Sequence, residues 1–149
     1  MPAIDVVSDA SVALKWFHTE GEQELEPAHA VLAAHRSRLI ALVVLDLTAY
    51  QIGNALLRGR AKATAEQVAV VLAALDEICP AVRPDEVELR LAAELAVSHR
   101  LTLYDAVYAA VAMSRDATLL TLDRALIEAN LGIRPSEFVP RLSPPEIDA

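Results

Sequence analysis

The sequence predicts a single α/β domain built on a mostly parallel sheet of four to five strands, covered by helices on both faces. Short apolar runs alternate along the chain with segments whose apolar residues recur at helical spacing. Strands that alternate with helices in this way pack as a parallel sheet between helical layers. The 149 residues are enough for one domain, and because 54% are hydrophobic but only 4% aromatic, we expect an aliphatic core.

The expected buried strands are short, apolar and rich in β-branched residues. We predict them at 3–7, 39–45 and 117–122. A shorter run at 78–82 contains Pro80, which cannot donate to a neighbouring strand, so this run is expected at an edge of the sheet. Residues 138–139 are the candidate for a last strand.

Helices are predicted between these runs. Their expected positions are 12–16, 24–35, 47–58, 63–77, 85–99, 101–113 and 124–130. Thr64 and Gln67 have the spacing of a capping box at the start of one of them. We expect one domain at 1–140, followed by a loose, proline-rich tail at 141–149.

The charge balance gives no sign of a broad basic face and counts against general nucleic-acid binding. The chain has 13 basic and 21 acidic residues and a net charge of −8, whereas a general nucleic-acid-binding surface is basic. A polyanionic substrate would therefore have to be held by a local site, by divalent metal ions or by a second subunit.

Cysteine content and hydropathy indicate a cytoplasmic protein that does not enter a membrane. Cys79 is the single cysteine, which excludes an intramolecular disulfide and a cysteine-based zinc cluster, and we expect it to be a packed thiol. The first residues lack the basic region of a signal peptide. No apolar run approaches the roughly 20 residues of a membrane span.

The most informative stretch is LTLYDAVYAAVAM at 101–113, which is apolar nearly all round and must therefore be buried. Asp105 lies near its start, and burying an unpaired charge is unfavourable. Two interpretations are open. Asp105 is either the acidic member of a capping box with Thr102 or a metal ligand.

Two other acids fall at matching places. Asp9 follows the first predicted strand and Asp123 follows the strand at 117–122, so both belong at the carboxyl edge of a parallel sheet. Each alone could be a helix cap, with Ser11 as the other candidate cap of the first helix. Together with Asp105, they form a set of mutually repelling carboxylates that needs a positive partner. Oxygen ligands suit Mg²⁺ or Mn²⁺, which polarises a phosphodiester and activates water for in-line attack.

Four motifs in this order resemble those of PIN-domain ribonucleases, specifically the VapC toxins of bacterial and archaeal toxin–antitoxin pairs. They are VSDAS at 7–11, QIGNAL at 51–56, LYDAVY at 103–108 and LTLD at 120–123. The resemblance extends from residue 5 to about residue 126, and the Tyr-Asp-Ala helix is its most specific part.

The resemblance implies a three-layer α/β/α fold and an endoribonuclease that cleaves RNA phosphodiester bonds with metal-activated water. It implies that Asp9, Asp105 and Asp123 bind Mg²⁺ or Mn²⁺, and that Gln51 occupies a fourth catalytic position. Ser11, Asn54 and Thr121 take supporting positions in the matched motifs. The implied partners are an RNA substrate, a VapB-type antitoxin and a second copy of the chain in a homodimer.

Gln51 departs from the family pattern, which has glutamate three residues before the asparagine that Asn54 matches. Glutamine keeps the shape but has no charge and cannot act as a base. Three explanations are open: a natural variant with weaker metal binding, an inactivating change in a toxic protein, or compensation by Asp46. Compensation is disfavoured because five residues turn a helix by about 500°, which leaves Asp46 about 140° away from Gln51.

Two other functions compete with a metal-dependent nuclease. The first is a catalytically silent PIN domain that acts by binding antitoxin or RNA, with Gln51 as the mark of lost chemistry. The second is a phosphotransfer or phosphatase domain with Asp9 as nucleophile, although the sequence shows no matching lysine motif.

Overall fold

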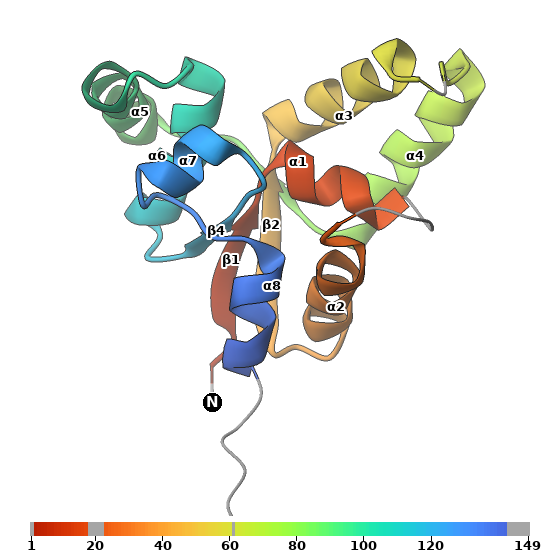
Figure 1. Cartoon of the computed structure of the whole chain (residues 1–149), viewed down its shortest axis with the longest axis horizontal. Helices are drawn as coiled ribbons and strands as arrows, with labels where there is room; N and C mark the ends of the chain where they lie inside the picture. The colour runs from red at the N-terminus through yellow and green to blue at the C-terminus, as the bar shows by residue number, and fades with distance from the viewer. Residues whose placement is uncertain (1, 18–22, 61, 143–149) are drawn as a thin grey trace, which may run out of the picture.

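A computed structural model describes residues 2–17, 23–60 and 62–142 and shows the predicted α/β fold (Figure 1). The four strands are β1 (Ile4–Ser8), β2 (Ile40–Leu45), β3 (Ala81–Val82) and β4 (Thr118–Leu120). They form one sheet in the order β3-β2-β1-β4, and every pair is parallel. The sheet thus has the lower of the two strand numbers expected, with the proline-flanked run at its edge.

The helices follow the predicted order with small shifts at their ends. They are α1 (Ala10–Ala13), η1 (Leu14–Phe17, a 3₁₀ turn), α2 (Leu25–Arg36), α3 (Asp46–Arg58), α4 (Ala65–Ile78), α5 (Glu86–His99), α6 (Leu103–Ser114), α7 (Arg124–Glu128), α8 (Pro135–Phe138) and the 3₁₀ turn η2 (Val139–Leu142). Thr64 and Gln67 form the predicted capping box of α4. Within the described ranges, no helix is long and apolar enough to cross a membrane.

The strand expected at 138–139 is wrong. Phe138 ends α8, and Val139 begins the turn η2. Pro135 is the first residue of α8, where its fixed φ favours a helix start, and Phe138 is 3% exposed in the core. The expected tail therefore begins inside η2, and residues 143–149 lie outside the described residues.

Side chains alternate across the sheet between two hydrophobic clusters, as strand geometry requires. Val6 points into the cluster formed with α1, α2, α3, α4 and α8, while its neighbour Val7 points into the cluster formed with α5, α6 and α7. Figure 1 shows β1 and β2 in the middle, with α1 to α4 on one side and α5 to α7 on the other. The fold therefore has three layers, α/β/α.

Helix α6 is buried as its sequence predicts, but not at its ends. Residues 106–112 are all at most 6% exposed, whereas Leu103, Tyr104 and Met113 are 52%, 61% and 53% exposed. At its C-terminal side, the Arg115 Nε donates to the nearly inaccessible Glu88 of α5 at 3.2 Å. This ion pair links the C-terminal end of α6 to the first turn of α5.

The loop after α7 passes so close to β4 that only glycine fits at position 132. The Ile133 N–H donates to the Leu119 carbonyl, and the Thr121 N–H donates to the Ile133 carbonyl, both at 3.0 Å. A Cβ on Gly132 would lie 2.6 Å from Thr121 Cγ2 and 3.2 Å from the Leu119 oxygen. The loop thus presses against the end of β4.

We expect Gly132→Ala to lower the free energy of unfolding by about 1–3 kcal/mol, because the added methyl must displace Thr121 or the β4 backbone. Urea denaturation measures the change. Gly53→Ala is the matched control: a Cβ there would meet Val68 at an ordinary 3.5 Å inside α3, so this variant should be neutral or more stable by about 0.5–1 kcal/mol. Equal destabilisation by both variants would contradict the close approach at Gly132.

Candidate active site

Asp9 follows β1 and is buried, with 4% exposure. Its Oδ1 accepts hydrogen bonds from the Val12 N–H at 3.2 Å and the Ser11 hydroxyl at 2.6 Å, and its Oδ2 accepts from the Thr121 hydroxyl. Asp9 is therefore the N-cap of α1, as one interpretation of the sequence had it. Since a carboxylate has about four acceptor positions, these three donors leave one on Oδ2.

The two hydroxyls that bind Asp9 are themselves held by backbone donors from the end of β4. Ser11 Oγ accepts from the Leu122 N–H and Thr121 Oγ1 accepts from the Asp123 N–H, both at 2.9 Å. Each hydroxyl thus accepts from the backbone and passes its own hydrogen to Asp9. This arrangement ties the end of β1 to the end of β4, two strands that are more than 100 residues apart in sequence.

A cavity of about 190 Å³ opens beside Asp9 at the carboxyl edge of the sheet. It brings together the three acids and the glutamine that the sequence singled out, and its lining consists of Asp9, Ala10, Ser11, Gln51, Asp105, Tyr108 and Asp123. These residues come from α1 and its cap, from α3, from α6 and from the cap of α7. The predicted convergence therefore exists in the fold.

Asp105 and Asp123 enter the cavity from the starts of two helices. Thr102 caps α6 by accepting from the Asp105 N–H at 3.1 Å, and Asp123 caps α7 by accepting from the Leu126 N–H at 3.2 Å. The capping boxes of α4 and α5 have a return bond from the acid or amide to the cap backbone, and the described hydrogen bonds of α6 do not include one. The Asp105 carboxylate is therefore not used as half of a capping box.

Burial and mutual repulsion raise the affinity of these carboxylates for protons. Burial raises the pKa of Asp9 to about 6, against the opposing effect of the hydrogen bonds from Ser11, Thr121 and Val12, and Asp105 adds a smaller repulsion. Burial also raises the pKa of Asp105, as does the charge of Asp123. The carboxylates therefore sense one another across the cavity.

Gln51 reaches the cavity from α3 and is bound by a residue that the sequence analysis did not assign to the site. The Tyr108 hydroxyl donates to Gln51 Oε1 at 2.8 Å and lies 2.6 Å from Thr48 Oγ1. Burial raises the pKa of Tyr108, so the phenol stays protonated. Helical spacing could have indicated both Tyr108 and Thr48 from the sequence. Tyr108 lies three residues after Asp105, and Thr48 lies three residues before Gln51, so each pair shares one helix face.

Three other candidate residues lie outside the cavity lining. Thr121 is fully buried behind Asp9 and acts through its hydroxyl. Asn54 is exposed on α3 and does not line the cavity. Asp46 is also exposed and borders two other cavities, in keeping with the angular argument against compensation.

Cys79 is a buried thiol, as predicted, and burial raises its pKa to about 12.

The donor set fits a hard divalent cation, although the side chains as placed do not yet surround one. In the described part of the chain, no three His, Cys, Asp or Glu side chains form a group ready to hold a metal ion. The carboxylates of Asp9, Asp105 and Asp123 nevertheless share one cavity, and the repulsion among them is what a cation relieves. Carboxylate oxygens are the ligands that Mg²⁺ and Mn²⁺ prefer.

Comparison with known proteins gives a family match and several similar structures. Residues 6–130 match the model of the PIN domain. The crystal structure of PAE2754 from Pyrobaculum aerophilum is similar, with a TM-score of 0.67 and 27% identity, over 93% of this chain and 89% of that one. No curated protein matches the chain.

Two further structures share the fold at lower identity. A toxin–antitoxin complex from Klebsiella pneumoniae has a TM-score of 0.64 and 14% identity, over 87% of this chain and 97% of that one. FitAcB from Neisseria gonorrhoeae has a TM-score of 0.64 and 16% identity, over 88% of this chain and 98% of that one.

The raised pKa of Asp9 predicts that stability falls as pH rises. The folded protein holds the Asp9 proton up to about pH 6, whereas the unfolded chain releases it near 3.8, so the free energy of unfolding should drop between about pH 4 and 7. We expect a drop of about 2–3 kcal/mol from this group. Asp9→Asn should remove most of it in urea denaturation across that range, whereas Asp46→Asn, an exposed control, should keep it. An unchanged slope in Asp9→Asn would contradict this assignment.

Proposed function

The chain belongs to the PIN-domain family, and on this premise we propose that it is a metal-dependent endoribonuclease toxin whose activity is lowered by Gln51. PIN domains are generally nucleases and generally use divalent metal ions. The observation that carries the proposal is the convergence of Asp9, Asp105 and Asp123, from three distant parts of the sequence, on one cavity. Such a set of oxygen ligands supports hydrolysis of a phosphodiester more than it supports any other chemistry at this edge of the sheet.

In this mechanism Asp9, Asp105 and Asp123 would hold Mg²⁺ or Mn²⁺. When bound, the ion supplies charge stabilisation for the scissile phosphate and lowers the pKa of water. Asp9 contributes one oxygen from a fixed position, because Ser11 and Thr121 prevent its carboxylate from turning. Asp105 is half-buried near the start of α6 and would contribute a second carboxylate oxygen to the ion.

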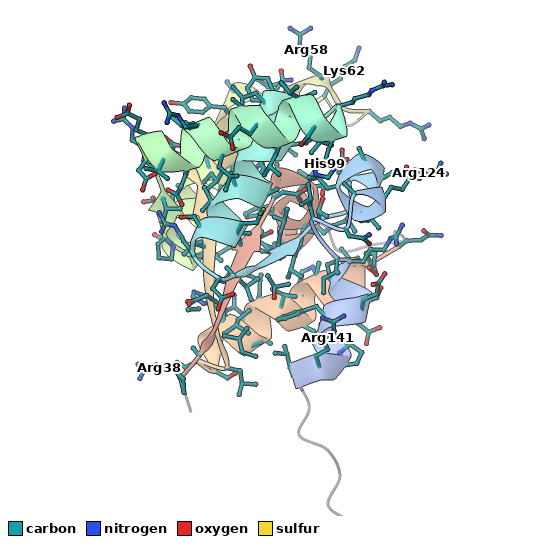
Figure 2. All side chains as sticks on the ribbon, turned by 90° about the vertical axis from the view of Figure 1, so that its left-hand side faces the viewer. Arg38, Arg58, Lys62, His99, Arg124 and Arg141 are labelled. Carbon is teal, nitrogen blue, oxygen red and sulfur yellow. The ribbon has the colours of Figure 1, made fainter. Side chains whose placement is uncertain are left out.

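Basic side chains lie at the same end of the molecule as the cavity and support an RNA substrate. Arg58 and Lys62 project from the end of α3 and the loop after it, at the opposite end from Arg38 (Figure 2). Arg58 follows Gln51 by two helical turns on one face of α3, about 10 Å along the axis. This local patch offsets the net charge of −8 where the RNA backbone would lie.

A groove between α3 and α4 supports a toxin–antitoxin pair with a VapB-type partner. The groove has a volume of about 590 Å³ and is lined partly by Leu56, Val70 and Val71, and Val70 is 65% exposed. An apolar groove between two helices suits the apolar face of a partner helix. One of the structurally similar proteins supports this proposal, because the structure from Klebsiella pneumoniae is a toxin–antitoxin complex. An RNA-cleaving toxin of this kind would act in the cytoplasm.

Homodimerisation is supported by a second apolar surface, at the starts of α5 and α6. Leu89, Leu103 and Tyr104 are 47%, 52% and 61% exposed and border one cavity of about 230 Å³ with Leu47 and Pro84. Exposed apolar side chains that gather in this way mark interaction surfaces. The surface adjoins the acidic cavity through Tyr104 and Asp105, which are consecutive in α6.

The nuclease proposal predicts cleavage of a pool of structured RNAs in Mg²⁺ or Mn²⁺ that EDTA abolishes. Gln51→Glu should cleave at least tenfold faster than the chain as it stands, because it restores a fourth carboxylate. Asp105→Asn is the contamination control and should lose at least 100-fold. If Gln51→Glu and the chain with Gln51 both cut no faster than Asp105→Asn, the proposal fails and the chain acts as a silent PIN domain that binds antitoxin or RNA.

The dimer proposal predicts that a charge at the start of α6 weakens self-association. Leu103→Glu should shift the protein towards the monomer in sedimentation equilibrium, raising the dissociation constant at least tenfold, because the new carboxylate loses its hydration in the interface. Met113→Glu is the matched control, since Met113 has nearly the same exposure, 53% against 52%, at the other end of α6. If the unsubstituted protein is a monomer, or if both variants have equal effects, this surface is not the interface.

A further inference from the structure

We propose that Thr48 and Tyr108 are positioning residues that hold the Gln51 amide with its oxygen turned away from the acidic cavity and its nitrogen turned towards it. Gln51 is then a hydrogen-bond donor to a phosphate oxygen and not a ligand of the cation. The inference rests on the proposed function and deepens it, because it concerns the same cavity. Its basis is a continuous chain of hydrogen bonds that leads from the β2 backbone to Gln51.

The series of hydrogen bonds begins at the end of β2. The Leu45 N–H donates to Thr48 Oγ1 at 3.1 Å, Thr48 Oγ1 lies 2.6 Å from the Tyr108 hydroxyl, and that hydroxyl lies 2.8 Å from Gln51 Oε1. Each hydroxyl carries a single hydrogen. When Thr48 donates to Tyr108, the Tyr108 hydrogen remains for Gln51, and both hydroxyl hydrogens have an acceptor.

The opposite amide orientation leaves a buried donor without a partner. If Gln51 presented its nitrogen to Tyr108, the Tyr108 hydrogen would have to go to Thr48. The Thr48 hydrogen would then have no acceptor among the hydrogen bonds of the described residues. Thr48 is 0% and Tyr108 1% exposed, so water does not replace the missing partner. A buried hydroxyl without an acceptor is unfavourable, which selects the first orientation.

The charge of the cavity selects the same orientation independently. Asp9, Asp105 and Asp123 line the cavity that Gln51 borders. The NH₂ group is the positive end of the amide dipole and the oxygen is the negative end. Turning the NH₂ group towards three carboxylates is attractive, and turning the oxygen towards them is repulsive.

The orientation decides what Gln51 can bind. An amide nitrogen has two N–H donors and no lone pair for a cation, so Gln51 as held suits a phosphate oxygen. Ligation through Oε1 would require the amide to turn over and break its bond to Tyr108. In Gln51→Glu the Tyr108 hydroxyl would still donate to one carboxylate oxygen, which leaves the other oxygen facing the cavity as a ligand. Tyr108 thus orients a hydrogen-bond donor when residue 51 is glutamine and a metal ligand when it is glutamate.

The first experiment measures Mn²⁺ dissociation constants by electron paramagnetic resonance in the absence of RNA. Gln51→Met removes both the oxygen and the NH₂ group at similar length, and it should change the constant less than twofold. Gln51→Glu should tighten binding at least tenfold. Asn54→Asp, which adds the same charge one turn along α3 and outside the cavity, should tighten it less than threefold. Weakening of fivefold or more in Gln51→Met would show that the oxygen is a ligand and overturn the inference.

The second experiment separates positioning from a structural role. Tyr108→Phe should leave Mn²⁺ affinity within twofold in the protein with Gln51 but weaken it at least fivefold in the Gln51→Glu variant, where Tyr108 orients a ligand. If Tyr108→Phe weakens Mn²⁺ binding equally with Gln51 and with Gln51→Glu, Tyr108 only supports the fold and is not a positioning residue. If Tyr108→Phe does not fold, Thr48→Val interrupts the same series of hydrogen bonds, and Thr48→Ser, which keeps the hydroxyl, is the control. In the Gln51→Glu background, only Thr48→Val should weaken Mn²⁺ binding.

Failure of the proposed function is distinguishable from failure of this inference. If no variant binds Mn²⁺, the metal-dependent function fails, and side-chain amide exchange measured by NMR decides the orientation alone. Gln67 is the internal reference, because its Oε1 accepts from the Thr64 N–H at 2.9 Å while its NH₂ group is on an exposed side chain. The Gln51 NH₂ protons should exchange with water within tenfold of those of Gln67. Exchange more than 100-fold slower would place the NH₂ group against Tyr108 and overturn the inference.

Discussion

The arrangement of this site depends on one constraint: a carboxylate is buried at the end of the central strand, and the described hydrogen bonds that satisfy it come from neutral groups. Asp9 is 4% exposed, and the described residues that bind its carboxylate offer neutral donors, the Val12 N–H and the hydroxyls of Ser11 and Thr121. Neutral donors lower the unfavourable energy of burial but do not cancel it, which is why the pKa of Asp9 stays near 6. The residual electrostatic strain is concentrated in the cavity, where a divalent ion would relieve it.

The same constraint shapes the fold around it. Because the two hydroxyls are fixed by the Leu122 and Asp123 N–H groups, the turn after β4 must lie against the start of α1. That turn holds Asp123 as the cap of α7, and the close passage of Gly132 behind Thr121 keeps it in place. Capping and site formation are thus one set of contacts here. Asp9 and Asp123 therefore cap helices and line the cavity at once, since each cap positions its carboxylate there.

The sequence was sufficient for the parts of the structure that depend on periodicity and on strand ends. Short apolar, β-branched runs placed β1, β2 and β4, and the rule that parallel strands end at one edge brought Asp9 and Asp123 together with Asp105. It was not sufficient where tertiary contacts decide. Two apolar residues at 138–139 are too few to show whether they belong to a strand or to a helix. Pro135 favours the start of a helix, and Phe138 ends that helix, α8. Likewise, the sequence shows Tyr108 as one more apolar residue of a buried helix, and only the fold brings its hydroxyl to Gln51 of α3.

That last contact also explains how glutamine can stand at position 51 without loss to the fold. A buried Tyr108 hydroxyl needs an acceptor, and Gln51 Oε1 fills this need as well as a glutamate oxygen would. The side chain keeps the same length and the same place on α3, so folding does not distinguish the two residues. Only the atom that faces the cavity differs, a donor in one case and a charged ligand in the other. At position 51, one terminal atom of the side chain accepts the hydrogen bond from Tyr108, and the other faces the cavity. The atom that faces the cavity can therefore differ while the bond to Tyr108 stays the same.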